Sequence, residues 1–99
     1  MSNFTVRVEL HGANESHYEL LHAYMAAAGF FKFVSGATPS GESGTWKLPT
    51  AEYDHSSERS AADVRDAVKL LADSVKPGAW VLITEVASRA WSTEKITTR

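Results

Sequence analysis

Hydrophobic and polar residues alternate along FTVRVELH, residues 4–11. Even-numbered positions are apolar and odd-numbered ones polar: Phe4, Val6, Val8 and Leu10 against Thr5, Arg7, Glu9 and His11. Because successive side chains of a β-strand point to opposite faces, this pattern predicts a strand with one buried face. The other face would then carry Arg7, Glu9 and His11 together.

Two later stretches repeat apolar residues at spacings of three and four, which is typical of helices. The first runs from Asn14, a suitable N-cap, to Gly29, a suitable C-terminal stop. The second follows Ser60, which with Asp63 resembles a capping box, and ends at the Lys-Pro-Gly of 76–78. The apolar stripes are Tyr18, Leu21, Met25 and Ala28 in the first helix, and Val64, Ala67, Val68, Leu71 and Val75 in the second.

Three further stretches favour extended structure. FFKFV at 30–34 predicts a second strand, and a third is expected at about 45–54, where Pro49 suggests an edge, a bulge or a strand end. AWVLITEV at 79–86 is nearly continuous in apolar residues, so we expect a central strand covered on both sides. The Gly- and Ser-rich stretch at 35–44 predicts a flexible hairpin loop. The tail SRAWSTEKITTR is expected either to add a short edge strand or to be loose from about 92.

The resulting order, β-α-β-β-α-β, predicts an α+β fold of the ferredoxin-like type. In it, two helices cover one face of a four-stranded antiparallel sheet. The opposite face stays bare, and Arg7, Glu9 and His11 would point there.

The composition fits one soluble domain over residues 1–99. The chain has 43% hydrophobic and 22% charged residues, which suffices for one core but not two. It has no cysteine, which excludes disulfides and thiolate metal sites and fits the cytosol. We find no basic segment followed by a long apolar run at the start, and nothing near the roughly 20 apolar residues of a membrane span, so we expect a cytoplasmic protein without a membrane partner.

Charge and motifs narrow the chemistry further. The net charge is -2 and the pI about 6.0, so nucleic acid would have to bind through a local patch. The chain has no phosphate-binding loop, no G-x-S-x-G elbow and no aromatic signature of an RNA-recognition motif. His17 and His22 are five residues apart rather than the four typical of zinc-binding helices, so we expect neither metal nor cofactor.

Three interpretations of the polar face remain open. The face is the solvated side of a half-buried strand, or it is part of a homodimer interface that covers Trp80 or Val81. The third interpretation is an active or ligand-binding site. There Arg7 would bind an anion, His11 would transfer protons, and Glu9 would orient Arg7 or His11. Elsewhere, alternating Phe31 and Phe33 are predicted to be core rather than base-stacking residues. Glu52, Asp54 and His55 are interpreted as a solvated strand end rather than a catalytic cluster.

Several phrases of the chain resemble the GhoS-type family of small bacterial proteins. They are NFTVRVELHGA at the start, AAAGF at the end of the first helix, LPTAEY in the third strand and WVLITE in the last, so the resemblance spans most of residues 3–91. It implies a ferredoxin-like fold similar to that of the Cas2 nucleases. The founding member is an endoribonuclease antitoxin of a type V toxin-antitoxin system. The acidic residue of Cas2-like proteins at the end of the first strand has no counterpart here, because Gly12 and Ala13 occupy that turn and Glu9 is the nearest carboxylate.

Two functions are therefore expected. The first is a GhoS-like antitoxin that cleaves a toxin transcript without metal, with RNA as partner and Arg7, Glu9 and His11 as catalytic residues. The second is a non-enzymatic protein-binding module, such as an inhibitor of phage or mobile-element origin, that docks through its sheet or its Trp46 and Trp91 regions. In both cases we expect a homodimer.

Overall fold

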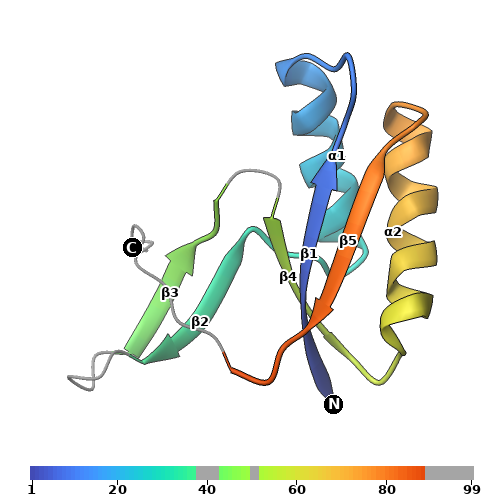
Figure 1. Ribbon diagram of the computed structural model, residues 1–99. Helices are drawn as coiled ribbons and strands as arrows, with labels where there is room; N and C mark the ends of the chain where they lie inside the picture. The colour runs from blue at the N-terminus through green and yellow to red at the C-terminus, as the bar shows by residue number, and fades with distance from the viewer. Residues whose placement is uncertain (38–42, 50–51, 89–99) are drawn as a thin grey trace.

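The computed structural model describes residues 1–37, 43–49 and 52–88, without the side chains of residues 36, 37, 43 and 46 (Figure 1). The elements along the chain are β1 (Ser2–Glu9), α1 (Glu15–Ala27), β2 (Phe33–Ala37), β3 (Ser43–Lys47), β4 (Glu52–Ser57), α2 (Ala61–Val75) and β5 (Trp80–Glu85). Trp91, the tail from 92 and the side chain of Trp46 lie outside this description, so the predictions that concern them stay predictions.

The strands form two antiparallel sheets. One is three-stranded in the order β4-β1-β5, with Val6 of β1 opposite Tyr53 on one side and Ile83 on the other. The other is the β2-β3 hairpin. A single bridge between Phe31 and Asp54 joins the two sheets. The expected α+β class, with two helices and antiparallel sheets, is confirmed.

One face of the three-stranded sheet packs against both helices. The alternate residues of β1 predicted to be buried are buried, and they share a core with Leu21 and Met25 of α1 and Val64 and Val68 of α2. The complete core cluster is Phe4, Val6, Val8, Leu10, Leu21, Met25, Phe30, Tyr53, Val64, Val68, Ala72 and Ala79. In Figure 1, α1 passes behind β1 and α2 stands beside β5. The two-helix, one-face arrangement follows from the stripes in the sequence.

Both helices begin at the predicted caps. Asn14 Oδ1 accepts a hydrogen bond from the backbone N–H of His17 at 3.2 Å, and Ser60 Oγ accepts one from that of Asp63 at 3.1 Å. His17 Nδ1 in turn accepts the N–H of Asn14 at 3.1 Å, which completes a capping box. His17 is therefore a helix-capping residue. Neither helix of the described residues is long and apolar enough to cross a membrane.

The predicted third strand at 45–54 is wrong, because the chain forms two strands there. β3 ends at Lys47 and β4 begins at Glu52, on either side of Pro49, which has no N–H to donate to a ladder. The N–H of Glu52 donates to the carbonyl of Pro49 at 3.1 Å. The predicted loop at 35–44 was also too long, since its two ends belong to β2 and β3.

Strand β5 is an edge strand of its sheet within the described residues, and not the central strand that its apolar run suggested. β1 occupies the centre instead. Only one face of β5 is covered: Val81 and Ile83 pack against the core, whereas Trp80 and Leu82 are 69% and 60% exposed.

Candidate functional site

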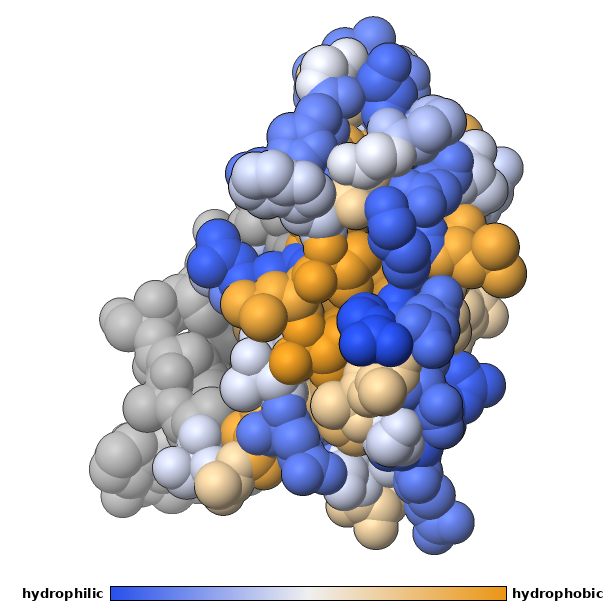
Figure 2. Space-filling view, turned by 45° about the vertical axis from the view of Figure 1, so that its right-hand side comes forward, coloured by the Kyte–Doolittle hydropathy of each residue, from blue (hydrophilic) through white to orange (hydrophobic). Residues whose placement is uncertain are grey.

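The face of the three-stranded sheet opposite the helices is called the uncovered face. Cross-strand neighbours lie on the same side of a sheet, so the register defines its members. They are Thr5, Arg7 and Glu9 of β1, Glu52 and Asp54 of β4, and Trp80, Leu82 and Thr84 of β5. Figure 2 shows a hydrophobic area near the middle of the molecule, where β5 lies, bordered by hydrophilic residues. The predicted placement of Arg7 and Glu9 on the bare face is confirmed.

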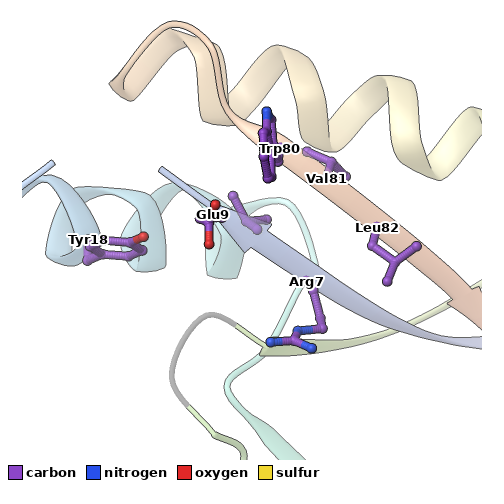
Figure 3. A pocket seen from close by; sticks show the side chains of 7 residues that line it. Arg7, Glu9, Tyr18, Trp80, Val81 and Leu82 are labelled. Carbon is purple, nitrogen blue, oxygen red and sulfur yellow. The ribbon is translucent and has the colours of Figure 1, made fainter. Parts of the chain in front are cut away.

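A cavity of about 420 Å³ opens on this face across β1 and β5 (Figure 3). It is lined by Arg7, Val8, Glu9, Tyr18, Trp80, Val81 and Leu82. Tyr18 reaches it from α1, where its hydroxyl is held by the backbone N–H of Leu10 at 3.0 Å. A second cavity of about 380 Å³ lies further down the face, between the hairpin and the sheet, and includes Phe33 and Asp54 in its lining.

Arg7 presents a cation on the uncovered face. Its side chain is 65% exposed, and its Nε lies 3.7 Å from Glu52 Oε1. An exposed ion pair at this distance is worth no more than about 1 kcal/mol, so it holds the guanidinium only weakly. The planar N–H groups of Arg7 suit a phosphate or carboxylate ligand in the neighbouring cavity.

His11 lies beyond the end of β1 and is held in place by two acceptors. Its Nε2 is 2.8 Å from Glu9 Oε2, and its Nδ1 is 3.0 Å from the carbonyl oxygen of Gly78. Both ring nitrogens of His11 therefore have an oxygen partner within hydrogen-bond distance. The ring also meets Trp80 edge-on at 4.5 Å. Arg7, Glu9 and His11 thus lie on the same side of the sheet.

Phe31 and Phe33 belong to the same face, against the expectation that they are core. Phe31 is bridged to Asp54, which lies opposite Thr5, so all three share a side. The two rings stack on each other at 5.2 Å and are 39% and 38% exposed. Lys47 lies directly across the hairpin from Phe33. Phe30 and Val34 are buried instead. The side chains of FFKFV therefore alternate between the two faces as predicted, but the even-numbered apolar positions are buried and not the odd-numbered ones.

Glu52, Asp54 and His55, interpreted from the sequence as a solvated strand end, do not share one side of β4. His55 points to the helix side of β4 and is buried, whereas its two acidic neighbours face the other way. Its Nδ1 is 3.0 Å from the carbonyl oxygen of Gly29, and its ring stacks on Phe30 at 4.1 Å. His55 is therefore a core residue, and the interpretation as a solvated strand end was wrong for it.

His22 is the remaining histidine, and it lies at the edge of the core. Its Nδ1 is 2.5 Å from the hydroxyl oxygen of Tyr53. Burial lowers the pKa of His22, and the nearby ammonium of Lys32 lowers it further. Burial also raises the pKa of the Tyr53 hydroxyl, which therefore keeps its proton and donates to the neutral imidazole.

This lowered pKa makes stability depend on pH. As the pH falls, the unfolded chain binds a proton at the ordinary histidine pKa of 6.5, before folded His22 does. The free energy of unfolding should therefore decrease from about pH 6.5 downward. In urea titrations at several pH values, His22→Gln should show a shallower decrease than the natural chain. Equal pH slopes for the two proteins would contradict this assignment.

The described residues contain no group of three or more His, Cys, Asp or Glu side chains arranged to hold a metal ion. The cavity residues instead combine one guanidinium, one carboxylate, a phenol and an indole, which suits binding by stacking and hydrogen bonding. In comparisons with known proteins, no family model, curated protein or solved structure matches this chain.

Proposed function

We propose that this protein is an RNA-binding antitoxin of the GhoS type, which binds single-stranded RNA on its uncovered face. The observation that carries the proposal is the set of exposed aromatic rings on that face: Trp80 beside Arg7, and the stacked pair Phe31 and Phe33. Exposed aromatic residues on a sheet are the usual platform for unpaired bases, because every base has a face that stacks.

The rings lie far enough apart to hold several nucleotides. Trp80 is opposite Glu9, whereas Phe31 continues the row of Thr84, Thr5 and Asp54. Three strand spacings and four residues along the strand separate Trp80 from Phe31, which amounts to roughly 19 Å. The two cavities lie along this path, and Arg7 lies between the two aromatic positions.

The uncovered face carries few cations, so we expect stacking rather than phosphate contacts to dominate the binding of RNA. Two cations accompany the rings, Arg7 on β1 and Lys47 opposite Phe33. The carboxylates of Glu9 and Glu52 are in contact with His11 and Arg7, which offsets part of their repulsion toward phosphate. With two phosphate contacts, the logarithm of the binding constant should fall with the logarithm of the salt concentration at a slope of only about -1.4.

The ferredoxin-like architecture is part of the same proposal. The Phe31–Asp54 bridge adds β2 beside β4, which would give the order β2-β4-β1-β5 for the four-stranded sheet. Strand β3 is then an addition that folds back on β2. In this arrangement the aromatic pair and Arg7 belong to one continuous surface.

Arg7→Ala tests the binding site. Anisotropy of a short labelled single-stranded RNA should show binding at low salt, and this variant should reduce the salt slope by about 0.7. The matched control is Arg65→Ala, which removes an arginine of similar exposure on α2 that is paired with Asp66. Failure of the natural chain to bind at low salt, or equal losses in the two variants, would contradict the proposal.

Cleavage of the bound RNA is the second step proposed. The ribose 2′-oxygen would attack the adjacent phosphorus while His11, as a neutral imidazole released from Glu9, takes the proton of the 2′-hydroxyl. The P–O5′ bond would break, and the 5′-oxygen would take a proton from water. Arg7 would stabilise the charge on the phosphate. In the same samples with a chelator, His11→Ala should abolish cleavage and retain binding.

A protein partner is the alternative outcome. Leu82, at 60% exposed, and the three carboxylates of the uncovered face would suit a partner with apolar and basic side chains. Such a module would give neither binding to RNA at low salt nor cleavage.

A further inference from the structure

Strand β5 offers an edge with the properties of a pairing surface. It lies at the border of the three-stranded sheet within the described residues, and Trp80 to Thr84 contain no charge and no proline. Natural edge strands usually carry lysine, proline or a bulge that prevents pairing with another chain. Their absence over five consecutive residues indicates that this edge has a partner.

The backbone groups at the edge can be identified from the ladder. The N–H of Val86 donates to the carbonyl of Asn3 at 2.8 Å, so this opposed pair is a hydrogen-bonded one. Such pairs alternate along an antiparallel ladder, so Trp80, Leu82 and Thr84 also bond to β1. The N–H and C=O groups of Val81, Ile83 and Glu85 therefore point away from β1.

Ala79 supports this assignment and shows where the edge begins. It precedes Val81 by two residues, so its backbone groups should face the edge as well. They do, because Lys69 Nζ donates to its carbonyl at 2.7 Å and Asp73 Oδ1 accepts its N–H at 3.1 Å. Side chains from α2 thus bond to both backbone groups of Ala79. The outward-pointing N–H and C=O groups of Val81, Ile83 and Glu85 have no hydrogen-bond partner among the described residues.

We infer that two copies of this chain pair β5 to β5 in antiparallel fashion, about a two-fold axis at Leu82, into one six-stranded sheet. Val81 then bonds to the second copy's Ile83, and Leu82 faces the second copy's Leu82 in a non-hydrogen-bonded pair. This register pairs the uncharged stretch of 80–84 with itself, so that the backbone groups of Val81 and Ile83 gain partners. Glu85 lies at the end of the ladder, opposite Ala79, whose backbone groups remain bonded to α2.

Self-pairing fits this edge better than another partner does. An edge strand without charged side chains cannot favour a basic or an acidic partner segment. The stretch from Trp80 to Thr84 is uncharged and therefore suits an uncharged strand such as a second copy of itself. The two-fold axis also keeps the helices of both copies on the same side, so the two uncovered faces join. The paired strands alone make a small interface, so we expect a weak dimer that dissociates on dilution.

The chain contains no cysteine, so single cysteines report the pairing directly. Leu82→Cys should form a disulfide-linked dimer under mild oxidation, because directly opposed residues bring their Cβ atoms close enough for a disulfide. The control is Leu70→Cys on α2, since Leu70 is even more exposed, at 76%. We expect cross-linking of the Leu82 variant to be at least about tenfold faster.

A mixture of Trp80→Cys and Thr84→Cys tests the register, because these positions oppose each other across the axis. The mixed dimer should form faster than either homodimer. Cross-linking of Leu82→Cys no faster than that of Leu70→Cys, with both variants folded by circular dichroism, would overturn the inference. None of these measurements involves RNA, so their result is independent of the proposed function.

Discussion

Phe4→Ala should lower the free energy of unfolding by about 3–5 kcal/mol, the largest loss expected from a single truncation here. Phe4 is fully buried on β1, the strand that pairs with both β4 and β5, and its ring stacks with His55 at a centroid distance of 6.2 Å. Removing the ring leaves a cavity between the sheet and the helices. A domain of this kind has roughly 5–15 kcal/mol in total, so a fifth or more of its stability would be lost.

Thr5→Ala is the matched control for Phe4→Ala. Thr5 is the next residue on β1 and points to the uncovered face, so its truncation should cost no more than about 0.5 kcal/mol. Urea unfolding followed by circular dichroism measures both variants. A loss below about 1 kcal/mol for Phe4→Ala would show that the core is not centred on β1.

Trp80→Ala and Phe31→Ala should each weaken binding of single-stranded RNA by about 5- to 150-fold, since stacking of one base on an aromatic ring contributes about 1–3 kcal/mol. Both rings lie on the uncovered face, Trp80 in the lining of the first cavity and Phe31 stacked on Phe33 of the second, and neither belongs to the core cluster. Fluorescence anisotropy measures the affinity. The loss should persist at high salt, because stacking does not depend on counterion release.

Leu70→Ala separates this effect from a general loss of apolar surface. Leu70 is the most exposed leucine of the described residues, and it lies on α2, outside the uncovered face. Its truncation should leave RNA affinity unchanged. Affinity of Trp80→Ala equal to that of the natural chain, or an equal loss in Leu70→Ala, would exclude the uncovered face as the binding surface.

The helices and the first strand could be predicted because their signals are local. Alternation in FTVRVELH fixes which side chains of β1 are buried, whatever the strand pairs with. Asn14 and Ser60 cap helices through bonds to residues three positions away. The prediction of one bare face carrying Arg7 and Glu9 followed from these elements alone.

The errors concern features that depend on distant partners. The apolar run at 79–86 looks the same in a central strand and in an edge strand that has one exposed face. The surroundings of Phe31 depend on its bridge to Asp54, and those of His55 on the approach of Gly29. An alternating aromatic stretch that begins with two phenylalanines fits two registers, and FFKFV alone does not distinguish them.

The candidate site was predicted in part for the same reason. Arg7, Glu9 and His11 share a side because they alternate along one strand. The hydrogen bond between His11 and the carbonyl of Gly78 joins residues 67 positions apart, so no sequence pattern near either residue predicts it. Trp80 could have been found from its place in an apolar strand, but only with the knowledge that β5 has an uncovered side.

The bridge between Phe31 and Asp54 has a mechanical consequence. It comprises two backbone hydrogen bonds at the base of the hairpin, where Lys32 also donates to the carbonyls of Pro49 and Glu52. In Figure 1 the hairpin extends from this base away from the three-stranded sheet. This short backbone link sets where the hairpin that carries Phe33 stands relative to Asp54, so the second cavity between them depends on two hydrogen bonds rather than on a continuous ladder.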